Sequence, residues 1–333
     1  MRSILSFIKA ASLLIQALLL LPGEGNTSPR DSSYRSLPAL DVAIELKTES
    51  VRPDSTSFTI SFSRVGNLIL VQGRADTTAG NFILDTGCPQ LVLNLTYFRH
   101  YNSTVDQEVE NAGMTGTVSA VTKATVRTFT FGTMNYYRME ADLVNLGHIE
   151  NRKGVKILGL LGMRFLSQFE MIIDFDNSLI HFHKIARKEA AVYKHQMLND
   201  TATYHIIPFE LVDNRIIVKT EMGGKKIRLI IDSGSETNIL DSRLPDKVFE
   251  KIAITGRIMI TGVGNRQVEA LQGNLRDMMI GNQPIVSMPV VVTNLEKTCF
   301  SYSGCVDGIL GFDFMSLQKI GFNFVNRKMY IWK

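Results

Sequence analysis

Short apolar runs separated by turn residues dominate the chain from about residue 57 onward. The runs "NFILD" (81–85) and "IRLIID" (227–232) are nearly continuous apolar segments that each end in an aspartate. Such runs are typical of strands buried on both faces of a sheet. Turn signals precede both runs, "DTTAG" at 76–80 and "EMGGKK" at 221–226. The pattern therefore predicts an all-β protein.

The second half of the chain repeats the first. A shift of 147 residues places Phe62 on Phe209 and Asp85 on Asp232. A shift of 149 residues then places "GLLG" (159–162) on "GILG" (308–311), as if two residues had been inserted in between. So many matches in the same order predict two similar β lobes related by a pseudo-twofold axis.

A helical pattern is limited to residues 244–252 and to the charged segment 185–198. The latter lies between the repeats and is followed by polar residues, so we interpret it as part of a linker. The predicted organisation is a signal peptide at 1–25, an N-terminal extension at 26–49, an N-terminal lobe at 50–184, a linker at 185–203 and a C-terminal lobe at 204–333.

The N-terminus resembles a secretory signal peptide. Arg2 and Lys9 precede an apolar run from Ala10 to Leu21, and a small, polar segment follows. An uncleaved anchor is the alternative, but a membrane span wants roughly 20 apolar residues and this run is shorter. We therefore expect an exported protein, secreted, periplasmic or at the cell surface, with no stable membrane span after cleavage.

The charged residues exclude some classes of partner. The formal charge of +4 comes from 36 basic and 32 acidic residues spread along the chain, whereas a nucleic-acid groove needs clustered basic residues. Nucleic acid is therefore not expected as a partner. His181 and His183 alternate as on a strand, but no cysteine or carboxylate pattern joins them. No metal or cofactor is expected.

Each repeat delivers one carboxylate to the end of a buried strand, where desolvation penalises the ionised form. If the lobes face each other, Asp85 and Asp232 meet and share one proton, because adjacent carboxylates do not readily ionise together. The ionised carboxylate can then act as a general base on water, while the protonated one donates to a carbonyl oxygen. The two aspartates are therefore the candidate catalytic pair.

A hydroxyl residue and a glycine follow each aspartate. The glycines, Gly87 and Gly234, allow the backbone to approach closely, and the hydroxyls of Thr86 and Ser233 can form hydrogen bonds across the pseudo-twofold axis. Together with Ser235, these residues are expected to support the active site.

The motifs "LDTG" with "GLLG" and "IDSG" with "GILG" resemble the two half-sites of the bilobal, pepsin-like aspartic peptidases, and each half resembles a retroviral-type protease subunit. The resemblance covers roughly residues 57–333. It implies two acid-protease-type β-barrel lobes with an active-site cleft between them, and a flap over the cleft. It also implies a monomeric aspartic endopeptidase, here of an exported, bacterial type, that hydrolyses protein or peptide substrates without a metal or covalent intermediate.

Two rival functions remain open. The same lobes could bind a peptide or glycan without hydrolysis, or could form a structural surface protein built from duplicated β domains. The paired motifs argue against both rivals, because neither needs two aspartates with matched hydroxyls and glycines.

Three features depart from the family pattern or stand outside it. Cys88 replaces the usual Ser or Thr, and because a thiol is a poorer hydrogen-bond donor, we expect Asp85 to be less stabilised as an anion than Asp232. The expected flaps, residues 111–126 and 260–275, lack the usual tyrosine. Cys299 and Cys305 bracket a short loop-like segment, so they are candidates for a disulfide, with two free thiols as the alternative.

Overall fold

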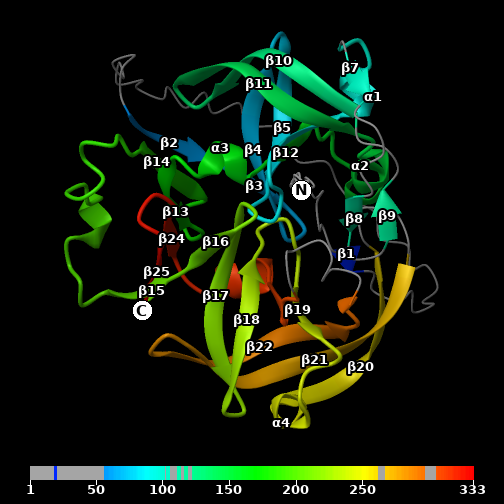
Figure 1. The fold of residues 1–333 in the computed structure, drawn as a ribbon, viewed down its shortest axis with the longest axis vertical. Helices are drawn as coiled ribbons and strands as arrows, with labels where there is room; N and C mark the ends of the chain where they lie inside the picture. The colour runs from blue at the N-terminus through cyan, green and yellow to red at the C-terminus, as the bar shows by residue number, and fades with distance from the viewer. Residues whose placement is uncertain are drawn as a thin grey trace, which may run out of the picture.

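The computed structural model describes residues 19–20, 56–101, 103–105, 111–113, 116–118, 122–261, 267–296 and 305–333. Strands make up most of these residues, and they form two lobes, as the repeat predicts (Figure 1). The upper lobe in Figure 1 comes from the N-terminal half and the lower lobe from the C-terminal half, while a third sheet lies to the left.

The N-terminal lobe contains an eight-stranded sheet. Its strands are, in spatial order, β3 (Ser63–Val65), β4 (Leu68–Ala75), β5 (Thr78–Leu84), β12 (Gly159–Leu161), β6 (Leu91–Asn94), β11 (Met134–Val144), β10 (Thr122–Phe131) and β7 (Ser103–Val105). A separate two-stranded hairpin joins β8 (Asn111–Gly113) to β9 (Gly116–Val118). The helices of this half are α1 (Leu95–Phe98), α2 (Gly147–Lys153) and α3 (Met163–Leu166).

The C-terminal lobe contains a nine-stranded sheet. Its strands are, in spatial order, β1 (Leu19–Leu20), β20 (Ile252–Thr261), β21 (Gln267–Ile280), β22 (Gln283–Thr293), β19 (Asn238–Asp241), β23 (Gly308–Leu310), β18 (Lys225–Ile231), β17 (Arg215–Met222) and β16 (Glu210–Val212). Within the described residues with given bounds, the helices of this lobe are α4 (Asp246–Phe249) and α6 (Phe312–Met315).

A six-stranded sheet joins the two halves of the chain. It contains, in spatial order, β15 (Tyr204–Pro208), β25 (Lys328–Trp332), β24 (Ile320–Asn323), β13 (Phe169–Asp174), β14 (Leu179–Lys184) and β2 (Ser57–Ser61). One face packs on the main core, where rings such as Phe58 and Phe182 stack with centroids 5.3 Å apart. This core runs continuously through both lobes, so burial of apolar surface holds them together.

The same chain path surrounds each aspartate. In the N-terminal lobe, β12 runs parallel to β5 and antiparallel to β6, so it lies between the strands that flank Asp85. In the C-terminal lobe, β23 lies in the same way between β18 and β19, which flank Asp232. The glycines that end the "GLLG" and "GILG" motifs are required here, because a Cβ on Gly162 or Gly311 would lie 2.2 or 2.3 Å from a backbone oxygen.

The helix expected within 185–198 is not formed. The segment consists of turns and a short 3-10 helix, Gln196–Leu198. Its side chains are taken up by other contacts: Glu189 accepts a hydrogen bond from the backbone N–H of Ala186 (2.6 Å), and the ring of Tyr193 stacks on His183 at 3.5 Å. These contacts with its own backbone and with the six-stranded sheet hold the segment in a non-helical path. The other predicted helix, at 244–252, is shortened to α4 because Ile252 begins β20.

Several expectations fall wholly or partly outside the described residues. These are most of the signal peptide, the N-terminal extension, parts of both expected flaps, and Cys299. Of the expected signal peptide, only Leu19–Leu20 is described, and it pairs with Ile260 and Thr261 of β20. The part of the chain that is described contains no helix long and apolar enough to cross a membrane.

Candidate active site

Asp85 and Asp232 occupy equivalent places at the ends of β5 and β18. The backbone N–H of Asp85 donates to the carbonyl oxygen of Leu161 (3.1 Å), and that of Asp232 donates to Leu310 (3.0 Å). Each aspartate is therefore held by the strand inserted beside it. Both carboxyl side chains are completely buried.

The hydroxyl residues tie the two aspartate loops together across the lobes. The backbone N–H of Thr86 donates to Ser233 Oγ, and that of Ser233 donates to Thr86 Oγ1, both at 3.0 Å. Each hydroxyl in turn donates to a backbone oxygen of the other lobe, Thr86 to Ile231 (3.0 Å) and Ser233 to Leu84 (2.8 Å). This reciprocal set fixes the spacing of the loops.

Each glycine lies against the carboxyl group of the opposite lobe. A Cβ on Gly87 would come within 2.3 Å of Asp232 Cγ, and a Cβ on Gly234 would come within 2.5 Å of Asp85 Cγ. Contacts under 3.0 Å are not tolerated by real Cβ atoms. The glycines therefore leave the space in which the two carboxyl groups meet.

The two carboxyl groups are not equivalent. Asp85 Oδ1 accepts two backbone N–H groups, from Gly87 and Cys88, both at 2.9 Å, whereas Asp232 Oδ1 accepts one, from Gly234 at 2.8 Å. Among the described residues, no group outside the pair donates a hydrogen bond to either Oδ2 atom. The surrounding backbone therefore leaves one oxygen of each carboxyl group free of hydrogen bonds.

Burial raises the pKa of both carboxyl groups. The pKa of Asp85 is raised to about 6. Desolvation is the main cause, and a hydrogen bond from the Asp232 carboxyl and the two N–H donors partly offset it. Desolvation and the neighbouring charge of Asp85 hold the pKa of Asp232 well above its usual range. The pair therefore retains one proton, on Asp232, when Asp85 is ionised.

A buried arginine also acts on the pair. Arg215, at the start of β17, is only 3% exposed, and its positive charge lowers the pKa of both Asp85 and Asp232. Under the shift of 147 residues its counterpart is Leu68, which is fully buried. In the aligned repeats, a charged residue therefore stands at the position where the other repeat has a core leucine. This mismatch is the sequence signal that could have identified Arg215.

Comparison with known proteins bears on this geometry. The family model described as "Aspartyl protease" matches residues 218–314, a segment that contains Asp232, Gly234 and the "GILG" motif. The match shows that residues 218–314 are similar to aspartyl proteases. The chain is also similar to the crystal structure of an aspartic proteinase from Irpex lacteus, with a TM-score of 0.48 and 14% sequence identity over 83% of this chain and 97% of that one. Comparison with the sequences of curated proteins finds no match.

Cys88 does not weaken Asp85 as an anion relative to Asp232, so that expectation is wrong. Its Sγ donates to the backbone oxygen of Gln90 (3.1 Å), and Ser235 Oγ likewise donates to Thr237 (2.8 Å), so neither side chain bonds to its aspartate. The backbone N–H of Cys88 supports Asp85 instead, and a backbone N–H does not depend on the side chain. Asp85, with two N–H donors, is the better stabilised anion.

The thiol of Cys88 is also protected from oxidation. It is fully buried and free, and burial together with the charge of Asp85 raises its pKa. Since the thiolate is the reactive form, this thiol is expected to be unreactive. Cys305 is disulfide-bonded; its predicted partner, Cys299, lies outside the described residues, and the pairing stays a prediction.

The two alternating histidines lie away from the aspartate pair, on the six-stranded sheet. His183 Nδ1 lies 2.6 Å from Ser57 Oγ, and His181 Nδ1 lies 2.9 Å from Thr59 Oγ1. The side chain of His183 is buried. Within the described residues, no three His, Cys, Asp or Glu side chains are arranged to hold a metal ion.

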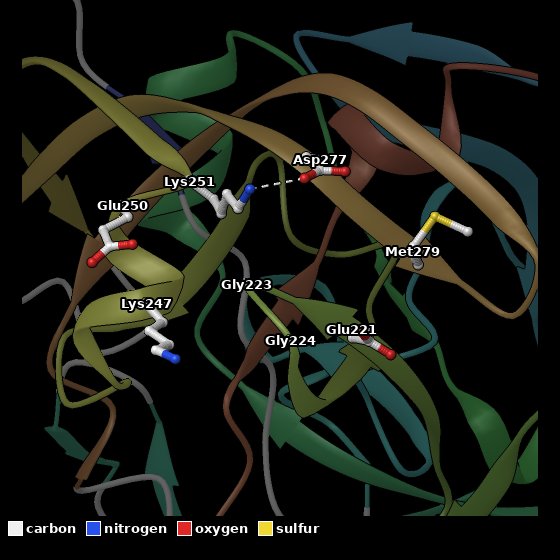
Figure 2. Close-up of a pocket in the computed structure, with 8 residues that line it drawn as sticks. All are labelled: Glu221, Gly223, Gly224, Lys247, Glu250, Lys251, Asp277 and Met279. Atoms are coloured by element: carbon white, nitrogen blue, oxygen red, sulfur yellow. Dashed lines mark hydrogen bonds and ion pairs between the residues drawn. The ribbon is translucent and has the colours of Figure 1, made fainter.

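A surface pocket of about 350 Å³ lies elsewhere on the C-terminal lobe (Figure 2). It is bounded by the turn at Gly223–Gly224, by α4 and by β21, and Lys251 and Asp277 form an ion pair of 2.9 Å at its edge. Its described lining residues include neither aspartate. The aspartate pair therefore lies at the interface between the lobes and not in this pocket.

Proposed function

We propose that the chain is an aspartic endopeptidase that hydrolyses peptide bonds by means of a water molecule activated between Asp85 and Asp232. The observation that carries the proposal is the asymmetry of the pair: one carboxyl has its pKa raised only to about 6, while the other is held well above its usual range. One residue type thereby supplies both a base and an acid.

The reaction follows from this asymmetry. Ionised Asp85 removes a proton from water, and the resulting hydroxide attacks the peptide carbon while protonated Asp232 donates its proton to the carbonyl oxygen. In the second step the tetrahedral intermediate returns that proton to Asp232, and Asp85 gives its proton to the leaving nitrogen as the C–N bond breaks. The pair ends in its starting state, with no cofactor consumed and no covalent intermediate formed.

The test uses purified wild-type, Asp85→Asn and Asp232→Asn proteins and a mixed peptide library. Both variants are expected to fold, because asparagine is nearly isosteric with aspartate, and to lose cleavage by several orders of magnitude. Thr86→Ser serves as a control that retains the interlobe hydroxyl. Retained cleavage by either asparagine variant would refute the assignment.

A binding protein without hydrolysis is the second candidate, and one observation favours it. Both catalytic carboxyl groups are completely buried, so a substrate reaches them only after a rearrangement. A pepstatin-type transition-state mimic separates the candidates by calorimetry. Binding that is lost in Asp232→Asn supports the peptidase, whereas binding of substrate peptides with no cleavage and no preference for the mimic supports the rival.

We also propose that the protein is exported after removal of residues 1–25 and acts as a monomer on protein or peptide substrates. The charged N-terminus followed by an apolar run supports export. The presence of both half-sites in one chain supports a monomer. N-terminal sequencing and sedimentation of the secreted protein test the two statements.

A further inference from the structure

A buried ion pair joins the two lobes close to the aspartates. Lys153 ends α2 in the N-terminal half, and Glu236 lies in the loop that follows Asp232. Lys153 Nζ lies 2.7 Å from both Oε1 and Oε2 of Glu236. The two side chains are only 13% and 7% exposed, so neither solvent nor salt screens the contact as it does on a surface.

The backbone of the N-terminal lobe closes over this pair. Asn67 donates its backbone N–H to Glu236 Oε2 (3.0 Å) and its side-chain amide to the backbone oxygen of Glu236 (2.9 Å). Gly66 takes a left-handed conformation (φ +60°), and a Cβ there would lie 2.8 Å from Lys153 Nζ and 2.9 Å from Glu236 Oε2. The turn at Gly66 is therefore shaped to the ion pair.

A second carboxylate extends the contact to α6. Asp313 accepts hydrogen bonds from the side chains of Asn67 (3.1 Å) and Thr237 (2.8 Å). Thr237 directly follows Glu236. The loop from Asp232 to Thr237 is thus held at its far end by residues of both lobes, just as Ser233 holds it at its near end.

Glu236 has no charged counterpart on the other side of the pseudo-twofold axis. The position equivalent to Glu236 under the shift of 147 residues is Pro89, which carries no charge. Burying two charges is unfavourable unless their geometry and hydrogen bonds compensate, so hydrophobic packing would have been a simpler way to join the lobes. The Lys153–Glu236 ion pair therefore fixes the position of the loop that carries Asp232, the aspartate with the higher pKa.

We propose that Lys153 and Glu236 are positioning residues, which fix the Asp232 loop against the N-terminal lobe in the arrangement that catalysis requires. The proposal rests on the peptidase function proposed above. Neither residue touches the reacting atoms. They act through the four-residue path from Glu236 back to Asp232, where a displacement of about 1 Å can lower a rate about a hundredfold.

The test compares Lys153→Met, Glu236→Gln, the double variant and Lys153→Arg. Lys219→Met is the matched control, because Lys219 forms an ion pair of 2.6 Å with Glu210 on the exposed surface of the C-terminal lobe. The measurements are kcat and KM across pH, and hydrogen–deuterium exchange of residues 230–238. The double variant leaves no unpaired buried charge, so it stays informative if a single variant fails to fold.

We expect Lys153→Met and the double variant to lower kcat about tenfold or more, with a smaller change in KM and faster exchange in the Asp232 loop. Lys153→Arg should recover most of kcat, and Lys219→Met should match the wild type. A double variant with kcat and loop exchange within about twofold of wild type would overturn the proposal. If the wild type cleaves no peptide, the proposed peptidase function is wrong. Hydrogen–deuterium exchange then still tests the positioning role: faster exchange of the Asp232 loop in the double variant supports it, and unchanged exchange overturns it.

Discussion

Gly87 lies directly over the carboxyl group of Asp232, with space for a hydrogen but not for a methyl group. A Cβ would come within 2.3 Å of Asp232 Cγ and 2.4 Å of both of its oxygens. The conflict is with a buried, hydrogen-bonded group, and neither side can move without disturbing the interlobe hydrogen bonds of Thr86 and Ser233. The contact therefore makes a direct prediction.

Gly87→Ala should lose nearly all activity and about 1–3 kcal/mol of unfolding free energy, the usual cost of overpacking a tight site. Urea denaturation and peptide cleavage measure the two effects. Gly256→Ala is the matched control, because no atom lies within 4 Å of a Cβ there, and it should behave as wild type. An active Gly87→Ala protein would contradict the packing of the aspartate pair.

Activity should fall as the pH drops through about 6. The proposed reaction needs Asp85 ionised and Asp232 protonated, and burial raises the pKa of Asp85 to about 6. Below that pH both carboxyls hold a proton and no base remains, whereas above it Asp232 keeps its proton because its pKa lies well above the usual range. The profile of kcat/KM should therefore show an acid limb near pH 6, and full activity at pH 4 would contradict the assignment.

Arg215→Leu should move this acid limb to higher pH. The positive charge of Arg215 lowers the pKa of both aspartates, and leucine is the residue at the equivalent position, Leu68, of the other lobe. Arg215→Lys keeps the charge and should leave the limb near its wild-type position. Arg257→Leu, on the exposed surface, controls for loss of an arginine elsewhere. The measurement is the pH profile of kcat/KM, and a limb that moves to lower pH in Arg215→Leu would disprove the electrostatic role.

Asp85→Asn should make the protein more stable at pH 7. The folded-state pKa of about 6 lies above the ordinary aspartate pKa of 3.8, so the folded state binds this proton more tightly than the unfolded state does. Ionisation of Asp85 therefore lowers wild-type stability as the pH rises from about 4 to about 6, by up to about 3 kcal/mol. Asparagine cannot ionise, so the variant should lack this part of the pH dependence. Urea denaturation at several pH values tests this, and a variant less stable than wild type at pH 7 would contradict it.

The aspartate loops could be predicted from sequence because their signals are local. An apolar strand, an aspartate, a hydroxyl and a glycine recur in order, and each recurrence supports the other. The bonding of Cys88 could not be predicted, because nothing in the sequence tells whether a side chain at that position points to the aspartate or to its own loop. The structure turns both Cys88 and Ser235 toward their own loops.

The contacts that depend on tertiary structure also escaped prediction. Lys153 and Glu236 are 83 residues apart, with no periodic pattern to join them. The helical pattern at 185–198 was misleading, because its charged and aromatic side chains find partners on the neighbouring sheet that outweigh helix propensity.

The six-stranded sheet is built from three strands of each half of the chain, which meet where β13, from the N-terminal half, pairs directly with β24, from the C-terminal half. A nick in the turn-rich segment 185–195 would consequently leave two fragments still held together by backbone hydrogen bonds and by shared phenylalanine rings. For the same reason the molecule should unfold in a single cooperative transition, and its halves should behave as complementing fragments and not as independently folding domains.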